Sequence, residues 1–285
     1  MRTIKLLCVK GISQVLLFDL LKIGIPSIRE EDCKIHLAVW NGYENPIDVF
    51  LSGDFEEWQT WQSKQNFGRK YIISLLQLPG VNKWLFAGGF VSDGSVYIEK
   101  EKYYQYKTSE LNEFQEFAGR LVVEFFRSGR QSYLNAENWS DGMSISEIKP
   151  EKLIIEEFTG YNKVKLSKRR LEIVVSQCIS SWKGALSNVS GVYLITDTKT
   201  GKLYVGSATG EGGIWQRWSE YADNGHGGNR ELVALLSEKG KEYSDNFQYS
   251  VLEIADTHAS LNDVLTRESY WKDILCSREH GLNKN

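Results

Sequence analysis

Cysteine is scarce in this sequence, with four residues in a chain of 285. Cys8, Cys33, Cys178 and Cys276 stand far apart, and no two of them form a C-x-x-C pair. This spacing argues against a zinc knuckle and against a disulfide framework. A reducing, cytoplasmic location fits this pattern best.

The sequence also lacks an uninterrupted hydrophobic run of membrane-spanning length, which is about 20 residues. The most apolar N-terminal run, Val15 to Ile25, contains Asp19 and Lys22 and has no small-residue cleavage site. We therefore expect a core helix in this run and no membrane partner.

An excess of positive charge is missing as well. The 34 basic and 37 acidic residues leave a formal charge of -3, so no bulk positive field indicates nucleic-acid binding. Any DNA-binding surface must therefore be local.

No low-complexity, proline-rich or glycine-rich linker divides the chain, and the sequence shows no internal repeat. Its length nevertheless predicts two domains. We expect an α+β protein with a strand-rich N-terminal domain at residues 1–170, a connecting helix at 171–187 and a second domain at 188–285.

The front part of the chain mixes short apolar runs with turn signals such as Pro79-Gly80 and Asp93-Gly94. This pattern predicts a barrel-like or mixed α/β region. A helix is expected next, from Leu171 to Leu186. The runs expected to favour strands are Ile4–Val9, Lys34–Trp40, Tyr71–Leu78, Lys83–Phe90, Leu121–Phe126 and Leu153–Phe158.

The last hundred residues predict a definite order of elements, β-β-α-α-β-α. A β-hairpin comes first, because two apolar strands flank a turn at Asp197–Gly201. The strands are expected at Gly191–Thr196, Lys202–Ala208 and Phe247–Ile254, and the helices at Ile214–Ala222, Asn229–Lys239 and Leu261–Leu275.

Two short motifs in the hairpin carry a family resemblance. Gly191-Val192-Tyr193 is followed, after ten residues, by Tyr204-Val205-Gly206, and the pair is similar to the GIY-YIG signature with a conservative change at each isoleucine. Arg217, Glu268 and Asn283 follow in the order in which that family places its arginine, glutamate and asparagine. Residues 188–285 therefore resemble a GIY-YIG nuclease domain, which implies a metal-dependent DNA endonuclease.

The resemblance also implies roles that suit phosphodiester hydrolysis. Glu268 would hold Mg²⁺ or Mn²⁺, since magnesium is commonly bound through one or two carboxylates. Arg217 would bind a phosphate oxygen through its planar fork of donors. Tyr193 is the favoured general base, and this role requires a pKa lowered by a cation such as Lys202, Arg217 or the metal ion.

The remaining site residues have less definite roles. Tyr204 would orient water or phosphate, and Asn283 would brace the scissile region or the Glu268 carboxylate. Many relatives carry a histidine four residues after the arginine, where this chain has Tyr221, and His226 could substitute for it. Each residue alone has a structural explanation, for example a tyrosine that favours a strand. The combination indicates a catalytic site.

DNA contacts outside the catalytic site are expected from basic residues, although a solvated surface is the plain alternative. Tryptophans 58, 61, 84 and 139 are expected in the core rather than stacked on bases. The aromatic front domain also suggests a small β-barrel that reads a flipped, modified base. The candidate DNA-binding residues are Lys163, Lys165, Lys168, Arg169, Arg170, Arg120, Arg127 and Arg130.

The sequence favours a restriction or phage-defence endonuclease that cleaves double-stranded DNA and senses base modification. A homodimer would allow cleavage of both strands. A homing or repair nuclease shares the same chemistry and remains an alternative. A DNA-binding regulator without cleavage activity is the alternative from another class, and the complete set of catalytic residue types argues against it.

Overall fold

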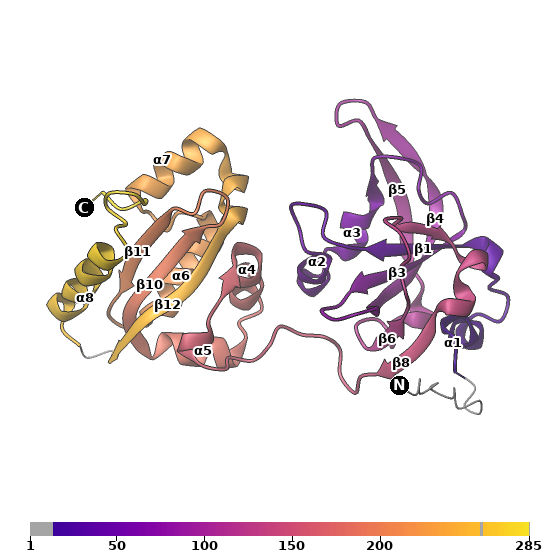
Figure 1. The fold of residues 1–285 in the computed structure, drawn as a ribbon, viewed down its shortest axis with the longest axis horizontal. Helices are drawn as coiled ribbons and strands as arrows, with labels where there is room; N and C mark the ends of the chain where they lie inside the picture. The colour runs from indigo at the N-terminus through magenta and orange to yellow at the C-terminus, as the bar shows by residue number, and fades with distance from the viewer. Residues whose placement is uncertain (1–13, 257–258, 285) are drawn as a thin grey trace, which may run out of the picture. The chain divides into compact units, whose positions relative to one another are not determined.

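The computed structural model describes residues 14–256 and 259–284, and the expected strand at Ile4–Val9 lies outside them. The chain forms two compact units, Met1–Ile154 and Ile155–Asn285 (Figure 1). This division comes earlier in the chain than the boundary at residue 170 that composition suggests. Among the described residues, no helix is long and apolar enough to span a bilayer.

The front unit is a mixed, strand-rich half-barrel, which confirms the strand-rich prediction. Its strands pair in the order β2-β5-β4-β3-β1-β7, while β6 pairs with both β4 and β8. Only β1 and β3 are parallel among these described pairs. The strands are β1 (Cys33–Ala38), β2 (Trp61–Gln62), β3 (Tyr71–Gln77), β4 (Lys83–Ile98), β5 (Tyr103–Glu110), β6 (Leu121–Glu124), β7 (Tyr133–Asn135) and β8 (Ser144–Ile148).

The two faces of this sheet pack against different helices and loops. Successive residues of a strand point to opposite faces, so Ile73 joins one core cluster and Ile72 the other. The expected core helix is confirmed as α1 (Leu17–Gly24), whose Leu17 and Leu21 are fully buried. The other helical elements are α2 (Pro46–Ser52), α3 (Phe55–Thr60), η1 (Glu30–Asp32), η2 (Asn112–Phe114), η3 (Ala136–Asn138) and η4 (Ser140–Gly142).

The second unit has the predicted element order from its hairpin onward, and its sheet is entirely antiparallel. The sheet order is β11-β10-β12-β9. Helices and strands begin or end within a few residues of the predicted positions. They are β10 (Val189–Asp197), β11 (Leu203–Ala208), α6 (Gly213–Asn224), α7 (Arg230–Lys239), η6 (Lys241–Asn246), β12 (Phe247–Asp256) and α8 (Leu261–Ile274).

The segment before the hairpin differs from the prediction. Residues 153–158 form no strand, and the single helix expected from Leu171 to Leu186 is two helices, α4 (Lys168–Ser176) and α5 (Ser180–Ser187). Cys178 lies between them with a φ of 49°, a conformation that cannot continue a right-handed helix. The preceding η5 (Tyr161–Lys163) and β9 (Leu166–Ser167) also belong to this unit, because β9 pairs with β12 and α4 packs on α6.

Candidate active site

The hairpin of β10 and β11 places the first motif tyrosine opposite the second motif glycine. Tyr193 pairs with Gly206 in the antiparallel register, and the Tyr193 side chain is fully buried. A Cβ atom at residue 206 would lie 2.5 Å from the Tyr193 hydroxyl oxygen, far inside van der Waals contact. The glycine of the second motif is therefore required because the ring of the first motif lies across it.

Helix α6 brings two further polar groups to this ring. Arg217 and Tyr221 are four residues apart, so they project from the same side of the helix. The Tyr193 and Tyr221 hydroxyl oxygens lie 3.0 Å apart, and Arg217 Nε donates to the Tyr193 hydroxyl over 3.2 Å. The predicted Tyr193, Arg217 and Tyr221 thus form one cluster.

The guanidinium of Arg217 is held on its other side by the loop after α6. Its Nη1 donates to the Gly227 carbonyl oxygen at 2.6 Å and to Glu220 at 2.5 Å. The carbonyl bond fixes the plane of the guanidinium. Because the Glu220 side chain is 45% exposed, its ion pair with Arg217 is a weak one, and a phosphate oxygen can compete for the same guanidinium.

Burial controls the protonation of the phenols in this cluster. It raises the pKa of Tyr193 above its ordinary value, and the neighbouring Arg217 lowers that pKa by a smaller amount. Burial likewise raises the pKa of Tyr221. The direction is opposite to the lowered pKa expected for Tyr193, because loss of solvation outweighs the nearby cation. Lys202, the other expected cation, is exposed at the hairpin turn.

Tyr204 connects the hairpin to α7. Its hydroxyl accepts a hydrogen bond from Asn229 Nδ2 at 3.2 Å, while Asn229 Oδ1 caps α7 by accepting from the backbone of Glu231 and Leu232. Burial raises the pKa of Tyr204, and the charge of Glu268 acts in the same direction. His226 uses its Nδ1 within the local turn, where it accepts from Gly228 N at 2.9 Å.

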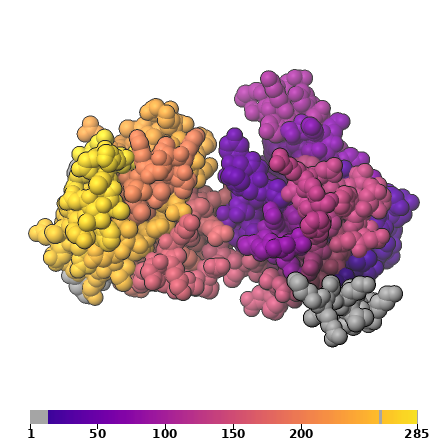
Figure 2. Space-filling view, in the orientation of Figure 1, coloured from indigo at the N-terminus to yellow at the C-terminus, as the bar shows by residue number. Residues whose placement is uncertain are grey.

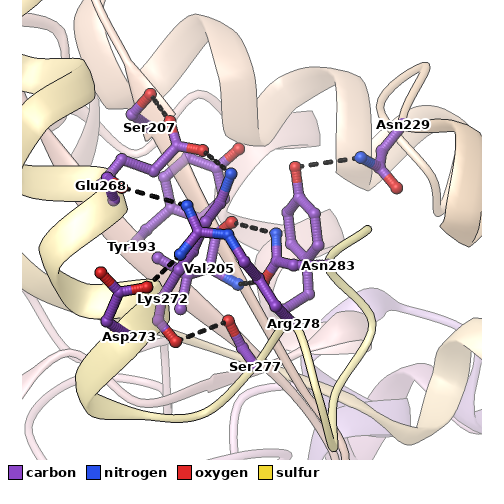
Figure 3. A network of polar contacts seen from close by, with 12 residues as sticks. Tyr193, Val205, Ser207, Asn229, Glu268, Lys272, Asp273, Ser277, Arg278 and Asn283 are labelled. Atoms are coloured by element: carbon purple, nitrogen blue, oxygen red, sulfur yellow. Dashed lines mark hydrogen bonds and ion pairs between the residues drawn. The ribbon is translucent and has the colours of Figure 1, made fainter. Parts of the chain in front are cut away.

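Glu268 lies on α8 between two partners that sequence reasoning did not identify (Figure 3). Ser207 of β11 donates its hydroxyl to one carboxylate oxygen, and Lys272 Nζ lies 2.7 Å from the other. The Lys272 and Glu268 side chains are only 6% and 13% exposed. The four-residue spacing of Glu268 and Lys272 is the signal that could have revealed this pair.

Asn283 clamps the edge strand of the sheet instead of the Glu268 carboxylate. Its Oδ1 accepts from Val205 N at 2.8 Å and its Nδ2 donates to Val205 O at 2.9 Å, which reproduces a strand pairing with a side chain (Figure 3). Asn283 is 1% exposed. The sequence led us to expect that Asn283 braces either the scissile region or the Glu268 carboxylate. In the structure, its side-chain amide bonds to the Val205 backbone and not to Glu268.

Comparison with known proteins identifies the family of this part of the chain. Residues 189–279 match the family model of the GIY-YIG catalytic domain. They form a GIY-YIG nuclease domain. The matched range includes both tyrosines of the hairpin, Arg217 and Glu268, and it ends before Asn283. This domain belongs to endonucleases that hydrolyse phosphodiester bonds.

Two solved structures are similar to part of the chain. One is a variant of the catalytic domain of the intron endonuclease I-TevI, at 27% identity over 34% of this chain and 94% of that chain, with a TM-score of 0.28. The other is the catalytic domain of the homing endonuclease I-TevI, at 28% identity over 34% of this chain and 98% of that chain, with a TM-score of 0.27. No curated protein matches the chain.

Nucleases of the GIY-YIG family generally use a divalent metal ion. The described residues contain no group of three or more His, Cys, Asp and Glu side chains that could enclose one. Glu268 and Ser207 instead offer a few hard oxygen atoms side by side, and the Glu268 side chain is 13% exposed. This donor set fits Mg²⁺ or Mn²⁺, because magnesium keeps several of its waters and commonly uses one or two carboxylates.

The candidate DNA-binding residues near the nuclease domain have different environments. Lys168 is 3% exposed, and its Nζ donates to Ala222 O at 2.8 Å and pairs with Glu172. The expectation that Lys168 meets phosphate is wrong, because packing of α4 on α6 buries its ammonium group. Lys163 and Lys165 are exposed, while Arg169 and Arg170 are half-buried.

Two of the three candidate arginines of the front unit hold backbone in place. Arg120 Nε donates to Lys149 O at 2.8 Å, and Arg127 Nε donates to Gln131 O at 3.0 Å. These hydrogen bonds occupy guanidinium N–H donors that would otherwise be available to a phosphate or a guanine. Arg130 is exposed.

Proposed function

We propose that this protein is a divalent-metal-dependent endonuclease of double-stranded DNA, in which the nuclease domain cuts and the front unit selects the site. The observation that carries the proposal is the joined polar network around the hairpin. Arg217 is fixed beside the buried hydroxyls of Tyr193 and Tyr221, and Glu268 accepts a hydrogen bond from Ser207 on the second strand of the same hairpin.

Arg217 is the group that would receive the scissile phosphate. Its Nε and one terminal nitrogen are directed by Tyr193 and Gly227, so the guanidinium plane is set before substrate arrives. Phosphate binding would replace the contact with Glu220 by a charge-assisted bond of the same kind. Such preorganised charge is worth most where negative charge develops in the transition state.

Glu268 would hold the divalent ion, with Ser207 and Lys272 fixing the orientation of its carboxylate. When bound, the ion supplies positive charge for the developing negative charge on the phosphoryl and leaving oxygens. The remaining steps use the chain's own groups.

Tyr193, once it has given up its own proton, would take the proton of the attacking water as the phenolate and return to the neutral phenol. Because burial raises its pKa, this role requires that positive charge added with the substrate complex lower that pKa. The neighbouring Tyr221 hydroxyl, 3.0 Å away, offers a route by which the proton can move on. Tyr204 would orient water or phosphate.

For the biological role, we propose a restriction or phage-defence enzyme that senses base modification and acts as a homodimer on both strands. The front unit, which the catalytic chemistry does not require, supports a separate reading function. A homing or repair role uses the same site and remains the alternative. The joined network disfavours a regulator that has lost cleavage.

The test is cleavage of supercoiled plasmid DNA by the purified full chain, with unmodified and modified plasmids, in Mg²⁺ or EDTA. We expect nicked or linear products only with Mg²⁺, and Glu268→Gln should abolish them while DNA binding persists. Cleavage in EDTA, or undiminished cleavage by Glu268→Gln, would overturn the assignment of the metal site. Absence of cleavage on every plasmid would overturn the enzyme proposal.

A further inference from the structure

A pocket of about 550 Å³ opens in the front unit, and its lining residues lie far in sequence from every residue that the cleavage chemistry uses. Its volume lies within the range of about 300–1,000 Å³ that is typical of small-ligand sites. Residues from β1, β2, β5, β7, α3 and the loop before α2 meet there. Its aromatic lining residues are His36, Trp40, Trp58, Trp61, Tyr103 and Tyr133.

The floor of this pocket is built from stacked aromatic rings. His36 is 3% exposed, and its ring stacks on Tyr133 with centroids 5.1 Å apart and planes 10° apart. Trp58 lies on the same histidine at 6.2 Å and 19°, and its Nε1 donates to Glu44 at 2.6 Å. Flat rings therefore stand in fixed orientations that could receive another flat ring.

The rim of the pocket exposes aromatic surface that no described contact explains. Trp40 is 67% exposed, Tyr103 is 43% exposed and Trp61 is 37% exposed. The prediction that Trp61 lies in the core is thus wrong. Tyr103 begins the second strand of the β4–β5 hairpin, which protrudes as an arm from the front unit (Figures 1 and 2). Exposed aromatic groups that gather around a concavity mark a binding site.

The polar groups of the pocket disfavour an anion and suit a ligand that has hydrogen-bond donors. Among the described residues that line it, none is a lysine or an arginine, and the one carboxylate is Glu44. Burial lowers the pKa of His36 to about 4, so this ring is neutral at physiological pH. Gln62 is 4% exposed and is fixed by bonds to Gln59 and Asn66. A phosphate would find no positive partner here.

We propose that this pocket binds one unpaired nucleobase of the target DNA, stacked against its aromatic rings. The choice of DNA rests on the proposed function of the nuclease domain. A base inside a duplex cannot enter such a pocket, so it must rotate out of the stack. Glu44 then accepts a hydrogen bond from an exocyclic amino group, as carboxylates do with cytosine N4. The pocket therefore selects cytosine or adenine over thymine.

The experiment measures binding of the full chain in EDTA, where cleavage is suppressed, by fluorescence anisotropy. The probes are duplexes of one sequence that carry a single cytosine, adenine or thymine opposite an abasic site, together with the fully paired duplex. We expect cytosine or adenine probes to bind at least roughly 10-fold more tightly than the paired duplex, which is the size of one base–aromatic stack. Glu44→Gln should retain this gain but lose the preference over thymine.

The side chains of Tyr103 and Tyr97 are almost equally exposed, so alanine variants of these two residues give a matched comparison. Tyr103 lines the pocket and is 43% exposed, while Tyr97 lies on the partner strand β4, outside the pocket lining, and is 42% exposed. Tyr103→Ala should remove the gain from the unpaired base, and Tyr97→Ala should leave it intact. An equal reduction of affinity in both variants would overturn the pocket assignment.

The outcomes separate this inference from the proposed function. If every duplex binds equally while plasmid cleavage persists in Mg²⁺, the pocket proposal fails and the nuclease proposal stands. If unpaired bases are preferred and nothing is cleaved, the pocket is supported and the nuclease proposal fails. The aromatic rings and Glu44 could also enclose a quaternary ammonium, so trimethyllysine is a further probe. Competition by trimethyllysine with the unpaired base at micromolar concentration would overturn the assignment of a nucleobase.

Discussion

At the scale of single residues, the site depends on charges that are mostly shielded from water. Lys272 and Glu268 form a pair over 2.7 Å, with exposed fractions of 6% and 13%. Removing one partner of such a pair leaves an uncompensated charge in a poorly solvated position. Lys272 is therefore a positioning residue for the carboxylate that we propose as the metal ligand. It also repels any cation that approaches the same carboxylate.

Lys272→Met should lower the cleavage rate and, at the same time, lower the Mg²⁺ concentration that gives half-maximal cleavage. The rate falls because the carboxylate loses its fixed orientation, and metal affinity rises, by about 10-fold, because a like charge is removed at close range. Metal titrations of the cleavage rate measure both effects.

Arg267→Met is the matched control for this variant. Arg267 lies on the same helix and pairs with Glu253 at 3.0 Å, but this pair is exposed at 39% and 36%. Exposed ion pairs contribute little to stability. The cleavage rate and the half-maximal Mg²⁺ concentration of Arg267→Met should therefore stay near those of the unaltered chain. A half-maximal Mg²⁺ concentration that rises in Lys272→Met would contradict the repulsion argument.

Tyr193→Phe should reduce cleavage by roughly 100-fold or more, because a positioned general base contributes about that much. The ring and its packing over Gly206 remain, so the fold should be kept. Tyr249→Phe provides the comparison, since Tyr249 is equally buried and also packs on Trp218, but it is not in the proposed site. Single-turnover rates should separate the two variants, and equal rates would remove Tyr193 from the chemistry.

At the scale of elements, the nuclease domain could be predicted well because its signals are local. The turn after β10, the spacing of apolar residues in α7 and the cap of α8 are all encoded within a few residues. The break at Cys178 and the burial of Lys168 could not be predicted in this way, because both depend on how α4 and α5 pack on α6. The Asn283 clamp joins residues 78 positions apart, a distance over which local patterns carry no information.

Tyr249 of β12 packs on Trp218 and Tyr221 of α6, and its buried hydroxyl allows a test of stability. The hydroxyl of Tyr249 is buried, and it has no hydrogen-bond partner among the described residues. An unsatisfied buried group costs about 1–3 kcal/mol, so Tyr249→Phe should increase the free energy of unfolding by about 1 kcal/mol. Chemical denaturation measures the change, and a destabilised variant would show that the hydroxyl has a partner.

Tyr249→Phe should also change how the free energy of unfolding depends on alkaline pH. Burial raises the pKa of Tyr249, so the folded state keeps a proton that the unfolded state loses above a pH of about 10. The unfolded state then binds fewer protons, and the free energy of unfolding falls as pH rises through this range. Tyr249→Phe should make that fall shallower, as denaturation curves between pH 9 and 11 would reveal.

At the scale of the whole molecule, a net charge of -3 means that DNA must be held by local groups. The structure divides the basic stretch at 163–170 into an exposed part and a buried part. Lys163 and Lys165 are exposed, whereas Lys168 serves the packing of the nuclease domain. The same division could not be predicted from the sequence, where the three lysines look equivalent.

Replacing both Lys163 and Lys165 with alanine should weaken binding to all DNA sequences about equally. Removal of one phosphate-binding cation reduces the slope of log K against log salt by about 0.9, so the double replacement should flatten it by about 2. Preference among sequences should survive, because phosphate contacts carry no base information. Gel shifts at several salt concentrations, with the exposed Lys239 and Lys241 replaced in parallel as the charge-matched control, give the comparison. An unchanged salt slope in the Lys163 and Lys165 variant would place the phosphate contacts elsewhere on the chain.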